Sequence, residues 1–390
     1  MTSTRARPPS YRWTVLSAGV LAQAAYSAML LGLPAIAPEI RDGFELTLTQ
    51  VGVVLAAPFA GALVTLLPWG LVADVIGERV VIGVGLATCA GALVWAAYAS
   101  SFAALAAALA VAGGLGAGVN SASGRAVMAW FGPEERGLAL GIRQTATPLG
   151  GAVGAVALPL LDDHLSLRAA FLGLAAGCFV AAFVAAALIR LETSDDPSAS
   201  ARPLRDPRVW RICVGSTFYV LPQLGMLGFF VLFLHDHRGI STTAAAAALA
   251  LTQVLGGIAR IAVGRWSDRL RMRIVPLRWV ALGIAASVAV TTAVLETPRF
   301  IVVPALVVAT TFALSWNGLS FAAAAETAGR ARSGAAIGLQ QTFLSAGGIV
   351  GPVAFAAVVH HYSWRLAFAL AAVSPLIGYA VLSPLAERRP

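Results

Sequence analysis

The sequence predicts an all-α membrane protein with twelve transmembrane helices, arranged as two six-helix bundles related by pseudo-twofold symmetry. Of the 390 residues, 58% are hydrophobic and only 12% are charged, whereas soluble domains carry about 25% charged residues. Eleven long stretches lack Asp, Glu, Lys, Arg and His, and the two halves of the chain repeat each other. This composition excludes a soluble enzyme, a nucleic-acid-binding domain and a disordered chain.

The uncharged stretches have the length of membrane-spanning helices, which need about 20 mostly apolar residues. The stretch 80–124 is long enough for two helices, and the small polar residues at 98–101 predict a turn between them. Continuous apolar character with Gly and Ala throughout favours helices over a barrel. The stretches are 13–38, 46–73, 80–124, 144–161, 169–189, 212–234, 239–259, 279–295, 300–325, 333–359 and 366–386.

The loops predict the orientation and the division of the chain. The sequence has no lysine, and 19 of its 27 arginines lie on the side of the N-terminus, against 5 in the opposite loops and 3 inside spans. An arginine excess marks the cytoplasmic side, so we expect a multi-pass protein of a bacterial cytoplasmic (inner) membrane with both termini in the cytoplasm. The polar segment 191–208 predicts a cytoplasmic linker between an N-terminal bundle (1–190) and a C-terminal bundle (209–390).

The two halves share sequence at a nearly constant spacing. The pattern Gly-x-x-Gln-Thr occurs at 141–145 and again at 338–342, 197 residues later. Asn120 and Asn317 are separated by the same 197 residues. Two repeats that face each other across a site at the middle of the membrane are typical of secondary transporters.

A short signature follows the second predicted helix of each half. The segment 70–79 reads Gly-Leu-Val-Ala-Asp-Val-Ile-Gly-Glu-Arg. It resembles the G-x-L-A-D-R-x-G-R-K signature of the major facilitator superfamily, although Val75 and Glu78 replace basic residues. The second copy begins at Gly264. Together with twelve helices and a central linker, the resemblance extends over essentially the whole chain and implies transport by alternating access.

The resemblance also implies a gating role for the signature loops, which close one side through charge contacts. Physically, an aspartate near a helix end can cap or pair there, and a glycine permits close helix approach. Glu326 is expected to join the gate by pairing with Arg265 or Arg330. The predicted gating residues are Gly70, Asp74, Arg79, Gly264, Asp268, Arg269 and Glu326.

Three arginines fall inside predicted spans, where a charge costs at least ~2.5–3.5 kcal/mol and therefore indicates a function. Arg260 resembles the helix-8 arginine with which the monocarboxylate, oxalate and nitrate branches of the superfamily hold anions, and a guanidinium suits a carboxylate. The competing interpretation is that these arginines snorkel to the interface or pair with gate carboxylates. The candidate substrate-binding residues are Arg260, Arg143, Arg125, Tyr26, Gln23, Asn120, Gln144, Tyr219, Gln223, Trp316, Asn317 and Gln341.

The leading hypothesis is transport of a small organic anion, with a carboxylate as the expected group, by proton symport, exchange or facilitated diffusion. The alternative is a drug/proton antiporter, because Gly141, Gly150 and Gly154 match part of an antiporter signature whose proline position is Ala155. A third possibility is a sensor that binds a ligand without moving it. We expect the small-molecule substrate, protons or a counter-anion, and membrane lipid as partners of a monomer.

Enzymatic motifs are not found in the sequence. It contains no HExxH, GxSxG or P-loop pattern, so we expect neither an enzyme nor an ATP-driven pump. The three cysteines lie in apolar stretches without metal-ligand spacing, which predicts small buried hydrophobes. No cofactor, metal ion or nucleic acid is expected to bind.

Overall fold

The computed structural model describes residues 11–131, 136–189, 206–328 and 333–385, and this part of the chain is almost entirely helical. The elements are α1 (Tyr11–Gly32), η1 (Leu33–Ile36), α2 (Ala37–Gly43), α3 (Leu48–Ile76), α4 (Glu78–Ala97), α5 (Phe102–Gly116), α6 (Gly118–Trp130), α7 (Arg136–His164), α8 (Leu167–Leu188), α9 (Pro207–Leu232), η2 (Phe233–His237), α10 (Thr242–Leu270), α11 (Ile274–Ala293), α12 (Arg299–Leu314), α13 (Asn317–Ala328), α14 (Ser333–His361) and α15 (Trp364–Leu382).

Within the described ranges, eleven helical segments are long and apolar enough to cross a membrane. Two of them are broken: α5 and α6 form one segment interrupted at Ala117, and α12 and α13 form another interrupted at 315–316. The twelfth span is α7, whose 29 residues run between α6 and α8. The predicted all-α fold with twelve transmembrane helices is therefore confirmed, and so is the turn at 98–101.

Hydroxyl side chains begin the helices that follow the loops of one side. Ser101, Ser166, Ser241 and Ser363 each accept a hydrogen bond from the backbone N–H three residues later. Thr47 does the same and forms a capping box with its N3 residue. Such caps satisfy N–H groups that the first helical turn leaves free, which in a membrane protein avoids unpaired polar groups near the lipid. They explain why these spans begin where they do.

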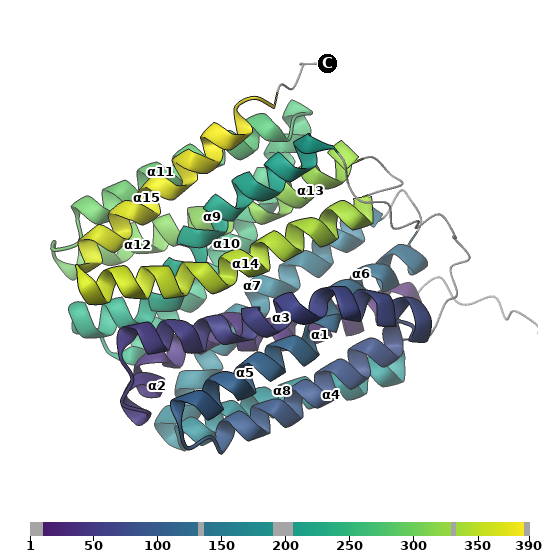
Figure 1. Ribbon diagram of the computed structural model, residues 1–390, viewed down its shortest axis with the longest axis horizontal. Coiled ribbons are helices and arrows are strands. Elements are labelled where there is room, and N and C mark those ends of the chain that lie inside the picture. The colour runs from purple at the N-terminus through teal and green to yellow at the C-terminus, as the bar shows by residue number, and fades with distance from the viewer. Residues whose placement is uncertain (1–10, 132–135, 190–205, 329–332, 386–390) are drawn as a thin grey trace, which may run out of the picture.

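The two halves of the chain form two bundles (Figure 1). In the first, α1 packs along α7, α4 along α8 and α3 along α5; in the second, α9 packs along α14 and α11 along α15. The bundles meet along two helix pairs, α3 with α14 and α7 with α10. The domain bounds stay a prediction, and α9 begins at Pro207, just inside the predicted linker.

The loops define two sides of the molecule. We call the side where α1 begins and α15 ends the terminal side, and the opposite side, which carries η1, α2 and η2, the distal side (Figure 1). Both ends of the described chain therefore lie on one side, as an even number of spans requires. All three cysteines are buried and unpaired, as expected for small hydrophobes.

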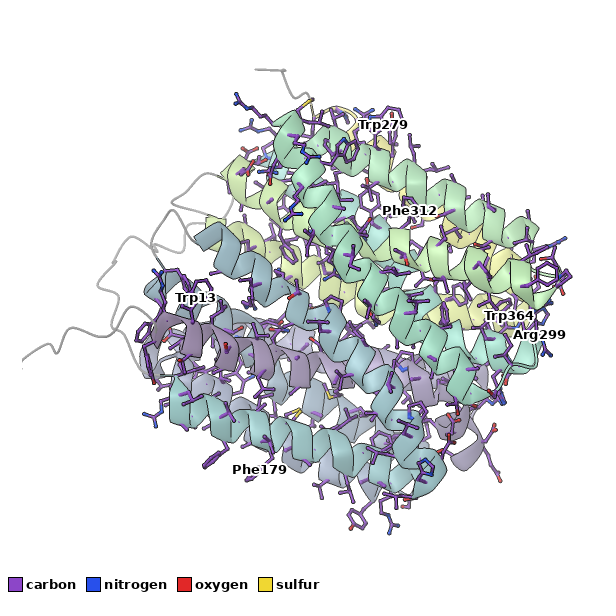
Figure 2. The ribbon with its side chains drawn as sticks, turned by 180° about the vertical axis from the view of Figure 1, so that it is seen from behind. Trp13, Phe179, Trp279, Arg299, Phe312 and Trp364 are labelled. Atoms are coloured by element: carbon purple, nitrogen blue, oxygen red, sulfur yellow. The ribbon has the colours of Figure 1, made fainter. Side chains whose placement is uncertain are left out.

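The outer faces of the bundles carry large apolar side chains. Phe179 is 61% exposed and points away from α8 (Figure 2). Trp13 and Trp279 lie toward the terminal side, and Trp364 lies at the distal side (Figure 2). Exposed Phe179 with exposed tryptophans toward the terminal side is the pattern that a lipid-facing surface shows, whereas Trp364 packs on phenylalanines of its own bundle. The functional side chains are therefore sought inside and between the bundles.

Candidate functional site

Arg143 lies on α7 and is bound entirely within the first bundle. Its Nε donates to Ser123 Oγ at 2.8 Å, and its Nη2 donates to the Asn120 carbonyl at 2.6 Å and to Gln23 Oε1 at 3.3 Å. Gln23 Nε2 in turn donates to Asn120 Oδ1 at 3.0 Å. The residue is buried, with 8% of its surface exposed. The structure thus joins three predicted site residues, Arg143, Gln23 and Asn120, in one hydrogen-bond network.

Arg260 lies on α10 in the second bundle. Its Nε donates to the Leu314 carbonyl at 2.8 Å, and its Nη2 donates to Asn317 Oδ1 at 3.1 Å. Leu314 is the last residue of α12, and its carbonyl is one of those that a helix end leaves without a partner in its own helix. Unlike Arg143, Arg260 is partly exposed. The predicted residues Arg260 and Asn317 are therefore in direct contact.

Both arginines bind beside a broken span. The α5–α6 break at Ala117 precedes Asn120 by three residues, and the α12–α13 break directly precedes Asn317. Each guanidinium donates to a backbone carbonyl in this region of the neighbouring helix. The equal spacing of the two asparagines predicts that they correspond, but it does not indicate that each would lie beside a helix break and an arginine.

The charge of these two arginines has no opposite charge beside it. Among the described residues, the hydrogen-bond partners of Arg143 and Arg260 are hydroxyl, amide and carbonyl oxygens, and none is a carboxylate. The positive charge is therefore oriented but not neutralised, which attracts an anion to any surface it can reach. The side chain of the third predicted arginine, Arg125, lies outside the described part of the structure.

Two predicted aromatic residues are packed inside their bundles. The Tyr26 hydroxyl donates to the Gly113 carbonyl at 2.8 Å, and its ring lies against Gly116. Tyr219 packs edge-to-face on Trp316, with ring centroids 5.6 Å apart, and against Gly378 of α15. Both tyrosines are fully buried. Their surroundings favour a packing role, although neither the Tyr219 hydroxyl nor Trp316 Nε1 has a hydrogen-bond partner among the described residues.

The remaining predicted amides are dispersed. Gln223 of α9 is buried, and its Oε1 has no partner in the described ranges. Gln144 and Gln341 are partly exposed on α7 and α14. The structure does not bring these three side chains into contact with Arg260 through any described hydrogen bond. They are positioned on helices of the interface or its neighbours, but they do not form one cluster.

Sequence reasoning missed Gln253. It lies on α10, is fully buried, and has no hydrogen-bond partner in the described structure for either Nε2 or Oε1. A Cβ atom added to Gly151 of α7 would lie 2.7 Å from Gln253 Nε2, so the amide reaches the other bundle. The spacing of seven residues between Gln253 and Arg260, which puts both on one helix face, is the signal that was available.

Two polar contacts join the bundles on the distal side. Arg41 Nη1 of α2 donates to Asp236 Oδ2 of η2 in an ion pair. Thr243 Oγ1 of α10 donates to Asp163 Oδ2 of α7 at 3.0 Å. The sequence reasoning did not single out these residues, although acid-x-Arg occurs at 39–41 and again at 236–238 with the 197-residue spacing of the repeats. The distal side therefore carries a cross-bundle latch, formed by Arg41, Asp236, Thr243 and Asp163.

Glycines show how far this closure extends. A Cβ added to Gly52 of α3 would lie 2.9 Å from Ala356 Cβ and 3.0 Å from the Pro352 carbonyl oxygen of α14. At Gly264 of α10 and Gly338 of α14, toward the terminal side, an added Cβ would meet no atom of the described structure within 4 Å. α3 and α14 are thus in tight contact distally, whereas no atom of the described structure lies against Gly264 or Gly338.

A family model described as Major Facilitator Superfamily matches residues 15–352. The chain belongs to this superfamily. Two strains of Mycobacterium tuberculosis, CDC 1551 / Oshkosh and ATCC 25618 / H37Rv, each have a protein described as an uncharacterized MFS-type transporter. Each is 33% identical over 371 residues, covering 94% of this chain and 83% of the relative. An uncharacterized transporter of Bacillus subtilis strain 168 is 28% identical over 174 residues, covering 44% of this chain and 39% of the relative.

Solved structures agree with the fold. A bacterial homolog of the human lysosomal transporter Spinster, in an inward-facing and unoccupied conformation, has a TM-score of 0.81 with 16% identity, covering 97% of both chains. The inward-facing and occupied form gives 0.82 with 17% identity, covering 96% of this chain and 97% of that one. At this identity the likeness shows the fold, and membership of the Major Facilitator Superfamily makes the chain a transporter of that general type.

The superfamily signature loop of the second bundle is held within its own bundle. Asp268 accepts from Arg273 Nη1 at 2.5 Å, and Glu326 lies 2.8 Å from Arg273 Nη2. Glu326 pairs with Arg273, which lies between both acids, and not with the expected Arg265. The other expected partner, Arg330, lies outside the described residues. Burial lowers the pKa of the Arg273 guanidinium, but its hydrogen bonds to Glu326 and Asp268 outweigh burial and raise the pKa.

The other predicted gating residues have no described cross-bundle contact. Arg79 and Arg269 are exposed, and Gly264 faces open space. The surroundings of Gly70 and the side chain of Asp74 lie outside the described part of the structure. A gating glycine without a close neighbour fits a conformation in which the terminal side is open, since small residues matter only where helices approach each other.

Proposed function

We propose that the chain moves a small organic anion, a monocarboxylate, across the bacterial inner membrane by alternating access, with Arg260 as the anchor. The observation that carries the proposal is the Arg260 guanidinium, which two neutral oxygens orient and which no described carboxylate neutralises. A charge kept inside a membrane protein at such cost is a functional residue by default. Its partial exposure leaves it accessible to a substrate.

The geometry leaves donors for a carboxylate. A guanidinium has five N–H donors in a planar fork, and Arg260 uses two of them on Leu314 and Asn317. The remaining donors include both hydrogens of Nη1. A carboxylate that binds here gains charge-assisted hydrogen bonds from a group that is already oriented, so little side-chain entropy is lost.

The orientation of the chain decides which state the structure represents. We infer from the arginine excess in the terminal-side loops that this side is cytoplasmic. The latch then closes the outer side, and the described conformation faces inward. The opposite state requires the latch to open and the signature loops to approach each other, which the glycines at 70 and 264 allow. Proton symport, anion exchange or the gradient of the substrate itself would drive the cycle.

Arg143 has a different role in this proposal. Its three hydrogen bonds hold α7 to α1 and to the first turn of α6, and it is buried. We assign it to stabilising the α5–α6 break, with Gln23 and Asn120. The partly exposed amides Gln144 and Gln341 remain proposed substrate contacts.

The test is uptake of labelled acetate, lactate and benzoate into proteoliposomes that contain the full chain. Arg260→Ala should lower uptake of the transported acid roughly 10- to 100-fold, because a hydrogen-bonded charge contact is lost. Arg260→Lys should restore part of it, because the charge remains but the fork does not. Arg208→Ala is the matched control, since Arg208 is exposed and pairs with Asp206 outside the site.

Two results would contradict the proposal. Uptake by Arg260→Ala equal to that of the unchanged chain would remove Arg260 as the anchor. Export of hydrophobic cations driven by a proton gradient, without carboxylate transport, would favour the drug/proton antiporter instead. A thermal-shift screen of the same acids and cations reports binding separately, because a ligand that binds the folded chain raises its stability with occupancy.

A further inference from the structure

Gln253 is a buried amide at the bundle interface that the proposed anion anchor does not use. It is fully buried, and neither Nε2 nor Oε1 has a hydrogen-bond partner among the described residues. A glutamine amide has two N–H donors and one acceptor oxygen, and burying them unpaired is unfavourable. The buried Gln340 of α14 differs in part: its Nε2 donates to Ser320 Oγ at 3.0 Å, and only its Oε1 has no partner among the described residues.

The position of Gln253 relates it directly to Arg260. Seven residues separate them on α10, which is two helical turns and about 10 Å along the helix axis. Residues seven apart lie on one face of a helix. Between them, Gly257 lies against Pro148 of α7, so this face of α10 is directed toward the first bundle. Since Pro148 packs against this face at Gly257 in the described conformation, a molecule can lie along it from Arg260 to Gln253 only after α7 and α10 separate.

The first bundle covers the amide. An added Cβ at Gly151 would lie 2.7 Å from Gln253 Nε2 and 2.9 Å from Leu31 Cβ of α1. Because Gly151 has no side chain, the Gln253 amide fits beside it. In the distally closed state both bundles enclose this amide. A group bound to Gln253 would be released to the distal side only when α7 and α10 separate.

We propose that Gln253 is a second substrate-binding residue, which hydrogen-bonds an uncharged polar group at the far end of the anion held by Arg260. This inference rests on the proposed function, because it needs the carboxylate at Arg260. The selected class is a monocarboxylate with a hydroxyl or carboxamide at its other end. A dicarboxylate of equal length is disfavoured, because a neutral amide does not compensate a second buried charge.

The experiment compares matched acids on the purified full chain. Straight-chain alkanoates and their ω-hydroxy derivatives with three to eight carbons are titrated by thermal shift, together with dicarboxylates of equal length. The unchanged chain should bind one ω-hydroxy acid about 3- to 10-fold more tightly than its unsubstituted partner, which is the size of one hydrogen bond. The preference should have a maximum at one chain length.

Four variants test whether Gln253 is the source of this preference. Gln253→Met keeps the size but removes the amide. The affinity for the ω-hydroxy acid should then equal that for its unsubstituted partner, whose binding should not change. Gln253→Asn keeps the amide on a shorter stem, and should move the preferred length upward by one methylene. Gln340→Met is the matched control for a buried glutamine. It should leave unchanged both the preference for the ω-hydroxy acid and the preferred chain length of the acid. Gly151→Ala, which displaces the Gln253 amide, should weaken the preference.

The outcomes separate the two proposals. Acids that bind through Arg260 without any gain from the hydroxyl would overturn the role of Gln253 and leave the proposed function standing. Retention of the preference in Gln253→Met would do the same. Acids that bind equally to the unchanged chain and to Arg260→Ala would overturn both.

Discussion

The distal and terminal halves of one interface differ in how the bundles meet. On the distal half, α3 and α14 approach until an added Cβ at Gly52 would lie 2.9 Å from Ala356 Cβ, and the Arg41–Asp236 ion pair joins the bundles. On the terminal half, added Cβ atoms at Gly264 and Gly338 would meet nothing within 4 Å in the described structure. α14 therefore carries both a close contact with α3 and, at Gly338, a position without a described neighbour.

The charges follow the same division. The described distal pair Arg41–Asp236 links two bundles, whereas the terminal-side group Asp268–Arg273–Glu326 lies within one. A contact within a bundle survives when the bundles move, and a contact between bundles exists in one state only. The latch, and not the signature loop of the second bundle, therefore holds the described conformation. Three substitutions test this comparison.

The largest effect is expected from Gly52→Val. Its side chain would overlap Ala356 and the Pro352 carbonyl, and overpacking typically costs about 1–3 kcal/mol. The closed distal state should lose population about 5- to 100-fold. Spin labels at Ser100 and Arg299, one on each bundle at the distal side, should report a longer distance. Gly338→Val is the control. If it lengthens the distance between the two labels as much as Gly52→Val does, the comparison is contradicted.

A smaller effect is expected from the ion pair. Arg41 and Asp236 side chains are 23% and 24% exposed, and such pairs are typically worth up to about 1 kcal/mol. Asp236→Asn should shift the labelled population toward the open distal state about 2- to 5-fold. The exchanged pair Arg41→Asp with Asp236→Arg should restore much of the closed population. If the exchanged pair is as open as the single variant, the attraction between these side chains does not hold the latch.

The smallest effect concerns a distal contact within the second bundle. His237 bonds Glu296 at 3.0 Å, and this hydrogen bond, followed by the charges of His237 and Arg238, lowers the pKa of the Glu296 carboxyl. Because its folded-state pKa is the lower one, its stabilisation is present above the unfolded value of about 4.3 and is lost as pH falls through the folded pKa.

Glu296→Gln should therefore lower the melting temperature slightly at pH 6. Between about pH 4.5 and 3, the melting temperature of this variant should fall slightly less than that of the unchanged chain. The label distance at the distal side should not change, because the pair does not cross the interface. A widened distance in this variant would mean that contacts within a bundle also control closure.

Prediction from sequence succeeded where one residue type decides the outcome. Uncharged stretches determine the spans, and the turn at 98–101 follows from small polar residues. The sequence also indicates that Arg260 lies inside a span, because charges there are rare. The partners of charged residues were harder to predict. Glu326 binds Arg273 and not Arg265, since the direction of a loop decides which of several neighbouring arginines reaches an acid.

The sequence by itself determined the twelve helices, the repeat and the three arginines inside predicted spans, because burial in lipid constrains each residue separately. Only the tertiary structure decided that Arg260 lies against Leu314 and Asn317, that the Gln253 amide has no hydrogen-bond partner among the described residues, and that the distal side is the closed one. These depend on how two bundles meet. In alternating access the same helices pack together in two different arrangements. Which side chains pair across the interface therefore depends on the conformation and not on the pattern of neighbouring residues in the sequence.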